Sequence, residues 1–146
     1  MPNPVLLKRF AAAAALGGAM LFAVPAITQD LNSLTVSQLM QEVIVPTTTA
    51  LWGAYEVQTD AQWQELESAA RRLIQAGELL RTGGSAATDR TIATNADWQE
   101  FSNQMLAASR SALEAIRGRN EEALFKAGND ELYPPCESCH AVYMPQ

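Results

Sequence analysis

The chain has 146 residues, 48% of them hydrophobic and 18% charged, a length that suits one globular domain with its own core. Sixteen acidic residues outnumber ten basic ones, so the formal net charge is −6. This acidity disfavours nucleic acid and anionic membrane surfaces as partners, and it suits a partner protein with a basic docking face.

The first 26 residues have the pattern of a signal peptide. Lys8 and Arg9 precede the apolar run 11–26, which has about the length of a signal-peptide core and ends in small residues at Ala26. We therefore expect cleavage after Ala26, export to the periplasm and a mature domain over residues 27–146. An uncleaved N-terminal anchor is the alternative, although the run is short for a membrane span. No later segment could cross a bilayer, so stable membrane insertion is not expected after cleavage.

Four stretches with apolar residues at helical spacing follow, and no stretch alternates convincingly as a strand would. The expected helices cover about 35–54, from Thr59 or Asp60 to the Gly/Ser/Thr-rich linker 81–90, from Asn95 or Asp97 to Arg117, and from Asn120 to Tyr133. Thr35 and Gln38 form an expected capping box, and Asn120 is the expected cap of the fourth helix. Short connections between such helices predict an all-α fold, an antiparallel four-helix bundle.

Prolines interrupt two of these stretches. Pro46 should kink the first helix, because its missing N–H cannot reach the carbonyl of Glu42. Tyr133 precedes Pro134, and a residue in that position avoids helical dihedrals, so Tyr133 should end or bend the fourth helix. Because proline is tolerated in a first helical turn, a short new helix could start there and carry the residues that follow.

The two cysteines and the only histidine of the chain lie together in the pentapeptide CESCH, residues 136–140. A disulfide between Cys136 and Cys139 is one interpretation, but such redox pairs usually accompany a βαβ pattern, and a disulfide leaves His140 unexplained. Zinc is a second interpretation, but a closed site needs four ligands, and the chain offers only two thiols and one imidazole.

Covalent attachment of haem c uses all three residues. Two thiols add to the two vinyl groups of the porphyrin, and the two-residue spacer lets both reach the same edge of the ring from one helical turn. The histidine that follows is delivered to the iron as its proximal axial ligand. The sequence therefore predicts one haem c, bound through Cys136 and Cys139 and ligated by His140.

A CxxCH motif at the end of a helical chain is similar to the class II c-type cytochromes, the cytochrome c prime-like family. The chain resembles this family in Cys136, Cys139 and His140, in Tyr143 at the place of an aromatic that follows the motif, and in the run ALEAIRGRNEEALFKAGNDELY. The resemblance implies a four-helix bundle whose first helix faces the distal side of the haem. It also implies that the chain can form a homodimer through its first two helices.

The second axial ligand must be a methionine, or the position stays open, because His140 is the only histidine. Met1 and Met20 lie in the signal peptide, and Met144 lies on the proximal side. In six-coordinate members of the family a methionine of the first helix binds the iron, and Met40 stands on the apolar face of that helix. Packing alone is the other interpretation for Met40, and it suits Met105 well.

We therefore expect an exported monohaem electron-transfer protein with His/Met ligation and a redox partner protein. No nucleophile–base pair is visible, so an enzyme is not expected. The alternatives are a five-coordinate protein that binds NO or CO, in which Met40 only packs, and a haem-free interaction protein. Two departures from the family stand out: the first helix lacks Lys and Arg, and Met144 replaces a basic residue. Arg71, Arg72 and Arg110 are the candidates to bind the haem propionates.

Overall fold

The structure is a computed structural model that describes residues 30–144, so the expected signal peptide and its cleavage site lie outside the described residues. All regular secondary structure in this range is helical, which confirms the all-α prediction. No helix within residues 30–144 is both long and apolar enough to cross a membrane.

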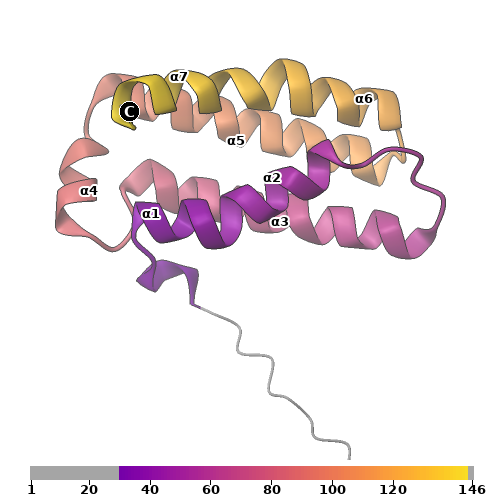
Figure 1. Cartoon of the computed structure of the whole chain (residues 1–146), viewed down its shortest axis with the longest axis horizontal. Coiled ribbons are helices and arrows are strands. Elements are labelled where there is room, and N and C mark those ends of the chain that lie inside the picture. The colour runs from indigo at the N-terminus through magenta and orange to yellow at the C-terminus, as the bar shows by residue number, and fades with distance from the viewer. Residues whose placement is uncertain (1–29, 145–146) are drawn as a thin grey trace, which may run out of the picture.

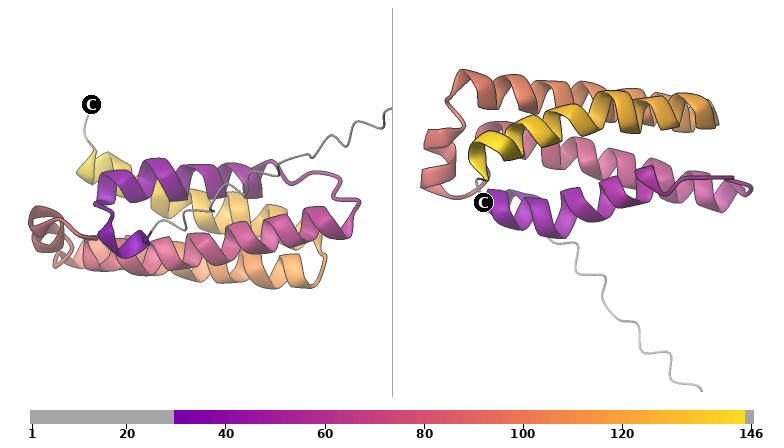
Figure 2. Two further views of the ribbon diagram at one scale, coloured as in Figure 1. Left: turned by 90° about the horizontal axis from the view of Figure 1, so that it is seen from below. Right: turned by 45° about the horizontal axis from the view of Figure 1, so that its top comes forward.

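Four long helical segments lie lengthwise beside one another, with the short helix α4 at one end (Figures 1 and 2). The first segment joins α1 (Val36–Leu39), η2 (Met40–Ile44) and α2 (Val45–Trp52), after the short turn η1 (Leu31–Ser33). The second is α3 (Asp60–Thr82), and α4 (Ala87–Ile92) leads to the third, α5 (Ala96–Arg117). The fourth joins α6 (Glu121–Lys126), η3 (Ala127–Leu132) and α7 (Tyr133–Tyr143).

The helices begin at the caps that the sequence predicts. Thr35 with Gln38 and Thr59 with Gln62 form complete capping boxes, in which each side chain bonds the other residue's backbone. The side chain of Asn120 accepts a hydrogen bond from the Ala123 N–H at 2.9 Å. These bonds satisfy backbone donors that a helix cannot pair internally.

Both interior prolines are preceded by a wide π-helical turn. The N–H of Val45, just before Pro46, donates to the carbonyl of Met40, five residues back. Tyr133, just before Pro134, donates in the same way to Gly128. The prediction that Tyr133 avoids helical dihedrals is wrong, since its φ and ψ are −65° and −45°. The wider turn gives the proline ring room, and the predicted new helix that carries CESCH is confirmed as α7.

The predicted linker 81–90 contains the start of α4, which the sequence did not predict because none of the residues of that helix is buried. Ahead of α4, Gly83 and Gly84 adopt positive φ angles of 83° and 59°. A Cβ on Gly84 would lie 2.7 Å from the carbonyl oxygen of Leu34, so this close passage requires glycine. The loop is fixed to the start of the chain by the Ser85 N–H, which donates to the Leu34 carbonyl at 2.9 Å.

The core is formed where the inner faces of the four segments meet. Helices α3 and α5 approach closely at Gly77, where a Cβ would lie only 2.8 Å from Cδ2 of Leu106. The largest fully buried apolar side chains come from all four segments: Leu39, Val43, Leu73, Ile116, Leu124 and Leu132. Within this arrangement the first segment packs mainly on α3, and α7 packs mainly on α5.

Candidate functional site

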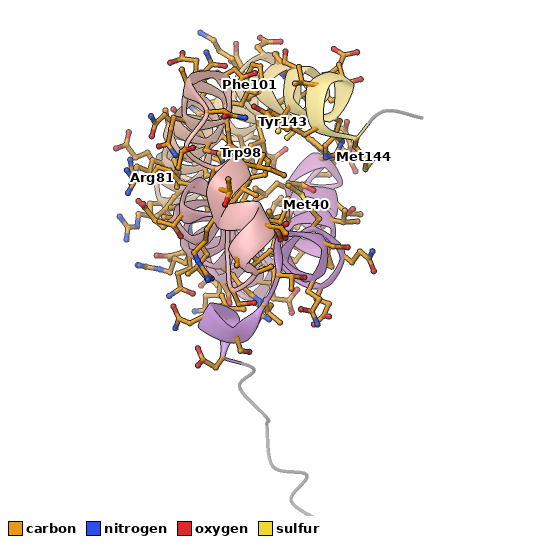
Figure 3. The ribbon with its side chains drawn as sticks, turned by 90° about the vertical axis from the view of Figure 1, so that its left-hand side faces the viewer. Met40, Arg81, Trp98, Phe101, Tyr143 and Met144 are labelled. Atoms are coloured by element: carbon orange, nitrogen blue, oxygen red, sulfur yellow. The ribbon has the colours of Figure 1, made fainter. Side chains whose placement is uncertain are left out.

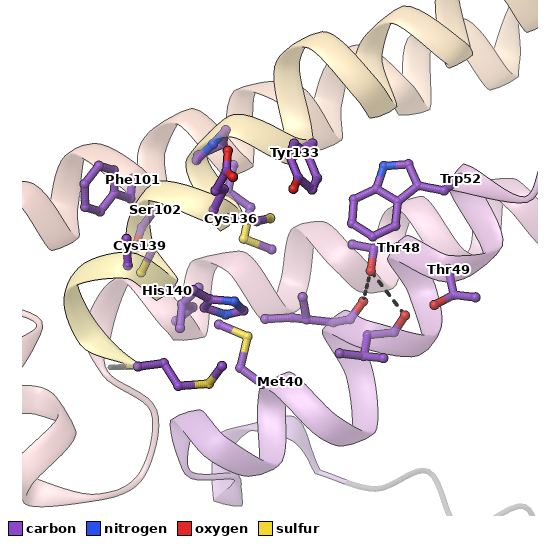
Figure 4. Close-up of a pocket in the computed structure, with 18 residues that line it drawn as sticks. Met40, Thr48, Thr49, Trp52, Phe101, Ser102, Tyr133, Cys136, Cys139 and His140 are labelled. Carbon is purple, nitrogen blue, oxygen red and sulfur yellow. Dashed lines mark hydrogen bonds between the residues drawn. The ribbon is translucent and has the colours of Figure 1, made fainter. Parts of the chain in front are cut away.

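A cavity of about 600 Å³ opens between the first segment, α5 and α7 (Figure 4). Its volume falls in the range of about 300–1,000 Å³ that is typical of small-molecule and cofactor sites. Its walls are mainly apolar and aromatic, and they include Ile44, Val45, Trp52, Leu80, Phe101 and Tyr133. The cavity can therefore hold a large and mostly apolar ligand.

The four residues predicted to bind the haem or its iron all line this cavity. Helix α7 brings Cys136 and Cys139 onto the wall one turn apart, with His140 beside them. Met40 lines the cavity from the first segment and lies near His140 (Figure 4). The chain thus places two thiols, one imidazole and one thioether around a common space.

Two further methionines line the same cavity. Met105 on α5 is buried in the core, which agrees with the packing role predicted for it. Met144, just beyond α7, is 62% exposed and lies on the same side of the molecule as Met40 (Figure 3). The sequence predicts that Met144 lies on the proximal side of the haem. Because Met144 also lines the cavity, its thioether needs its own experimental control.

The two cysteines are free thiols. Burial, followed by the influence of Cys139, raises the pKa of the Cys136 thiol to about 11, and burial raises the pKa of Cys139. Redox-active and readily oxidised cysteines need the opposite, a lowered pKa that favours the thiolate. The raised pKa values therefore do not favour a redox-active pair of cysteines at this site.

A buried residue with a hydroxyl, Ser102, lines the otherwise mainly apolar cavity. Three of the buried hydroxyl side chains, Thr47, Thr48 and Ser109, donate to helix carbonyls at 2.7 to 2.8 Å. Ser102 is 3% exposed and lines the cavity, and among the described residues no buried side-chain oxygen or nitrogen lacks a hydrogen-bond partner. Ser102 therefore places a hydroxyl in the wall, which a polar group of a ligand or a water could meet.

The residues present fit a haem. The thiols have the spacing for two thioethers, imidazole and thioether sulfur are established iron ligands, and the walls are mainly apolar and aromatic. The fit lacks a cation: among the described residues no Lys or Arg lines the cavity, and Glu137 is its one acidic side chain. Arg71 and Arg110 instead pair with Glu67 and Glu78, both at 2.7 Å.

The end of α7 is held on α5 by an aromatic contact and a hydrogen bond. The rings of Tyr143 and Trp98 meet edge to face, with their centroids 4.9 Å apart. The Tyr143 hydroxyl donates to the Asp97 carboxylate, which lowers the pKa of Asp97, and it accepts from Asn95 at 3.3 Å. The sequence identifies Tyr143 only as an aromatic that follows the motif, so it does not predict this support for the helix that carries His140.

Within the described part of the chain, no group of three or more His, Cys, Asp or Glu side chains is arranged to hold a metal ion. Comparisons with models of protein families, with curated proteins and with solved structures found no match to this chain.

Proposed function

We propose that the chain is an exported monohaem c-type cytochrome of the class II type, an antiparallel four-helix bundle that carries electrons in the periplasm. Cys136 and Cys139 would hold the haem c covalently, His140 would be the proximal ligand of its iron, and Met40 the distal one. The observation that carries this proposal is the shared cavity, in which Met40 meets a CxxCH motif that lies far from it in the sequence.

The roles of the four residues follow from their chemistry. The bound haem would supply an iron that takes up and releases one electron. The two cysteines fix the position of the ring from α7, and the imidazole of His140 comes from the same helix turn. A methionine thioether favours the ferrous state, so Met40 would raise the reduction potential.

The charge distribution favours a basic redox partner. The stretches that carry the site, residues 30–59 and 127–144, contain acidic residues but neither Lys nor Arg. Apart from Lys126, the basic residues of the described part all lie between Arg71 and Arg119, on α3, α4, α5 and the loop after α5. An acidic side around the cavity would steer a basic partner toward it and would make association depend on ionic strength.

The ligand assignment is tested by the absorption spectra of the purified holoprotein and of three methionine variants. The wild type should show a low-spin ferric spectrum with the weak far-red band of a sulfur–iron bond. Met40→Leu should remove that band, while Met105→Leu and Met144→Leu should retain it. The two control variants remove a thioether from the same cavity, so they separate ligation from packing.

Two results would contradict this assignment. A sulfur–iron band that persists in Met40→Leu would transfer the ligand role to another residue. A wild-type ferrous protein that is high-spin and whose spectrum shifts at once with carbon monoxide would favour the five-coordinate alternative, a protein that binds NO or CO.

A further inference from the structure

The first helical segment carries two stripes of side chains that both repeat every four residues. Leu39, Val43, Thr47 and Leu51 are buried in the core. Met40, Ile44, Thr48 and Trp52 line the cavity. A regular α-helix turns by about 100° per residue, so twelve residues advance it by three turns and about 120°. In a regular helix Met40 and Trp52 could therefore not share one face.

The π turn η2 removes this mismatch. In η2 the N–H of Val45 donates to the Met40 carbonyl, so the turn holds one more residue than an α-helical turn. One extra residue in the turn offsets about 100° of rotation, which is most of the 120° that would otherwise separate the faces of Met40 and Trp52. The turn therefore lets Met40 lie on the same face as Trp52, the face that lines the cavity.

Pro46 and two threonines favour this wide turn. In the α-helical register the ring of Pro46 would collide with the carbonyl of residue 42, and it would supply no N–H to that carbonyl. The Thr47 hydroxyl donates to the Val43 carbonyl at 2.7 Å, and the Thr48 hydroxyl donates to the Ile44 carbonyl at 2.8 Å. These bonds occupy carbonyls just before the proline, where the regular ladder is disturbed.

We propose that Pro46 is a positioning residue for Met40. By excluding the α-helical register it keeps the turn Met40–Ile44 wide, and the wide turn holds the Met40 thioether in the cavity. This role rests on the proposed function, because it matters for ligation only if Met40 binds the iron.

The test is Pro46→Ala in the haem-loaded protein. Alanine restores the missing N–H and favours the regular helix, which rotates Met40 away from the cavity. We expect the sulfur–iron band to lose at least half of its intensity, while covalent haem staining on a denaturing gel stays unchanged. Gln41→Ala is the matched control, because it shortens an exposed side chain in the same turn and leaves the backbone donors intact; it should retain the band.

A rescue variant separates positioning from a general loss of stability. Deleting Gln41 from Pro46→Ala places Trp52 eleven positions after Met40 instead of twelve, and a regular helix covers eleven positions in three turns and about 20°. This double variant should recover the sulfur–iron band. The double variant also keeps the proposal testable if Pro46→Ala alone does not accumulate. In that case, a folded double variant without the sulfur–iron band would overturn the proposal.

Further outcomes assign the failure to one proposal or the other. A full band in Pro46→Ala, together with its loss in Met40→Leu, would overturn the role of Pro46 and leave Met40 as the ligand. A full band in Met40→Leu would instead overturn the proposed ligation itself. In the background of Met40→Leu, the change Pro46→Ala should have no further effect on the spectrum.

Discussion

Trp98 provides a measurable link between α3, α5 and the end of α7. Its side chain is 5% exposed, its indole N–H donates to the Leu80 carbonyl at 2.9 Å, and its ring contacts Tyr143. Trp98→Phe keeps an aromatic ring at this place but removes the N–H donor and two ring carbons. The variant therefore tests how much this junction contributes to the stability of the fold.

The expected loss can be worked out from these contacts. The Leu80 carbonyl also accepts from the Gly83 N–H at 3.0 Å, so it keeps a partner and only one net hydrogen bond is lost, about 1 kcal/mol. Two buried ring carbons at about 0.8 kcal/mol each add about 1.6 kcal/mol. The free energy of unfolding should fall by about 2.5 kcal/mol.

Trp63→Phe is the matched control. Trp63 is 8% exposed, and its indole N–H has no hydrogen-bond partner among residues 30–144, so this change should cost only the packing part, about 1.6 kcal/mol. Urea unfolding of both variants, followed by circular dichroism at one pH, measures the difference of about 1 kcal/mol that the indole–carbonyl bond contributes. If Trp98→Phe costs no more than Trp63→Phe, the reasoning from this hydrogen bond is refuted.

Three further predictions concern titration and haem attachment. Tyr143→Phe should raise the pKa of the Asp97 carboxyl, because the hydroxyl that lowers it is gone; carboxyl NMR titration measures this, and an unchanged pKa would contradict the assigned bond. Since the lowered pKa belongs to the folded state, the bond stabilises above the unfolded pKa of Asp97 and is lost as the pH falls through the folded one. In the haem-free protein, the alkylation rate of Cys136 should keep rising to a pH of about 11, whereas a plateau near the ordinary value of 9.0 would refute the effect of burial. His140→Ala should keep the covalent haem stain but lose the low-spin spectrum, whereas Cys139→Ala should weaken the stain. A stain that is lost in His140→Ala and kept in Cys139→Ala would contradict both assigned roles.

Local chemistry made most helix starts predictable. Thr35, Thr59 and Asn120 cap helices through bonds to backbone groups only three residues away, so the sequence contains both partners. Helix α4 was missed because it has no buried residue and therefore no apolar periodicity. The rule for residues before proline was wrong at Tyr133, because it does not consider a π turn that widens the backbone ahead of the ring.

The site was predictable only in part. CESCH names three of its residues because attachment chemistry fixes their spacing within one helix turn. The nearness of Met40 to His140 was expected from family resemblance, since no local pattern relates residues so far apart. Ser102 was missed because a single small polar residue in an apolar stripe has no distinctive signal until the cavity is seen. None of Arg71, Arg72 and Arg110 lines the cavity, and charge alone does not reveal that Arg71 and Arg110 have carboxylate partners, so their role toward the propionates stays a prediction.

The central claim is that Cys136 and Cys139 bind haem covalently. The most direct measurement is the intact mass of the denatured protein, produced in cells that mature c-type cytochromes and separated from all non-covalent ligands. The account predicts the mass of the chain plus one haem, and loss of that addition when both cysteines are replaced by serine. A mass equal to the chain alone, or to the chain less two hydrogen atoms as for a Cys136–Cys139 disulfide, would contradict it.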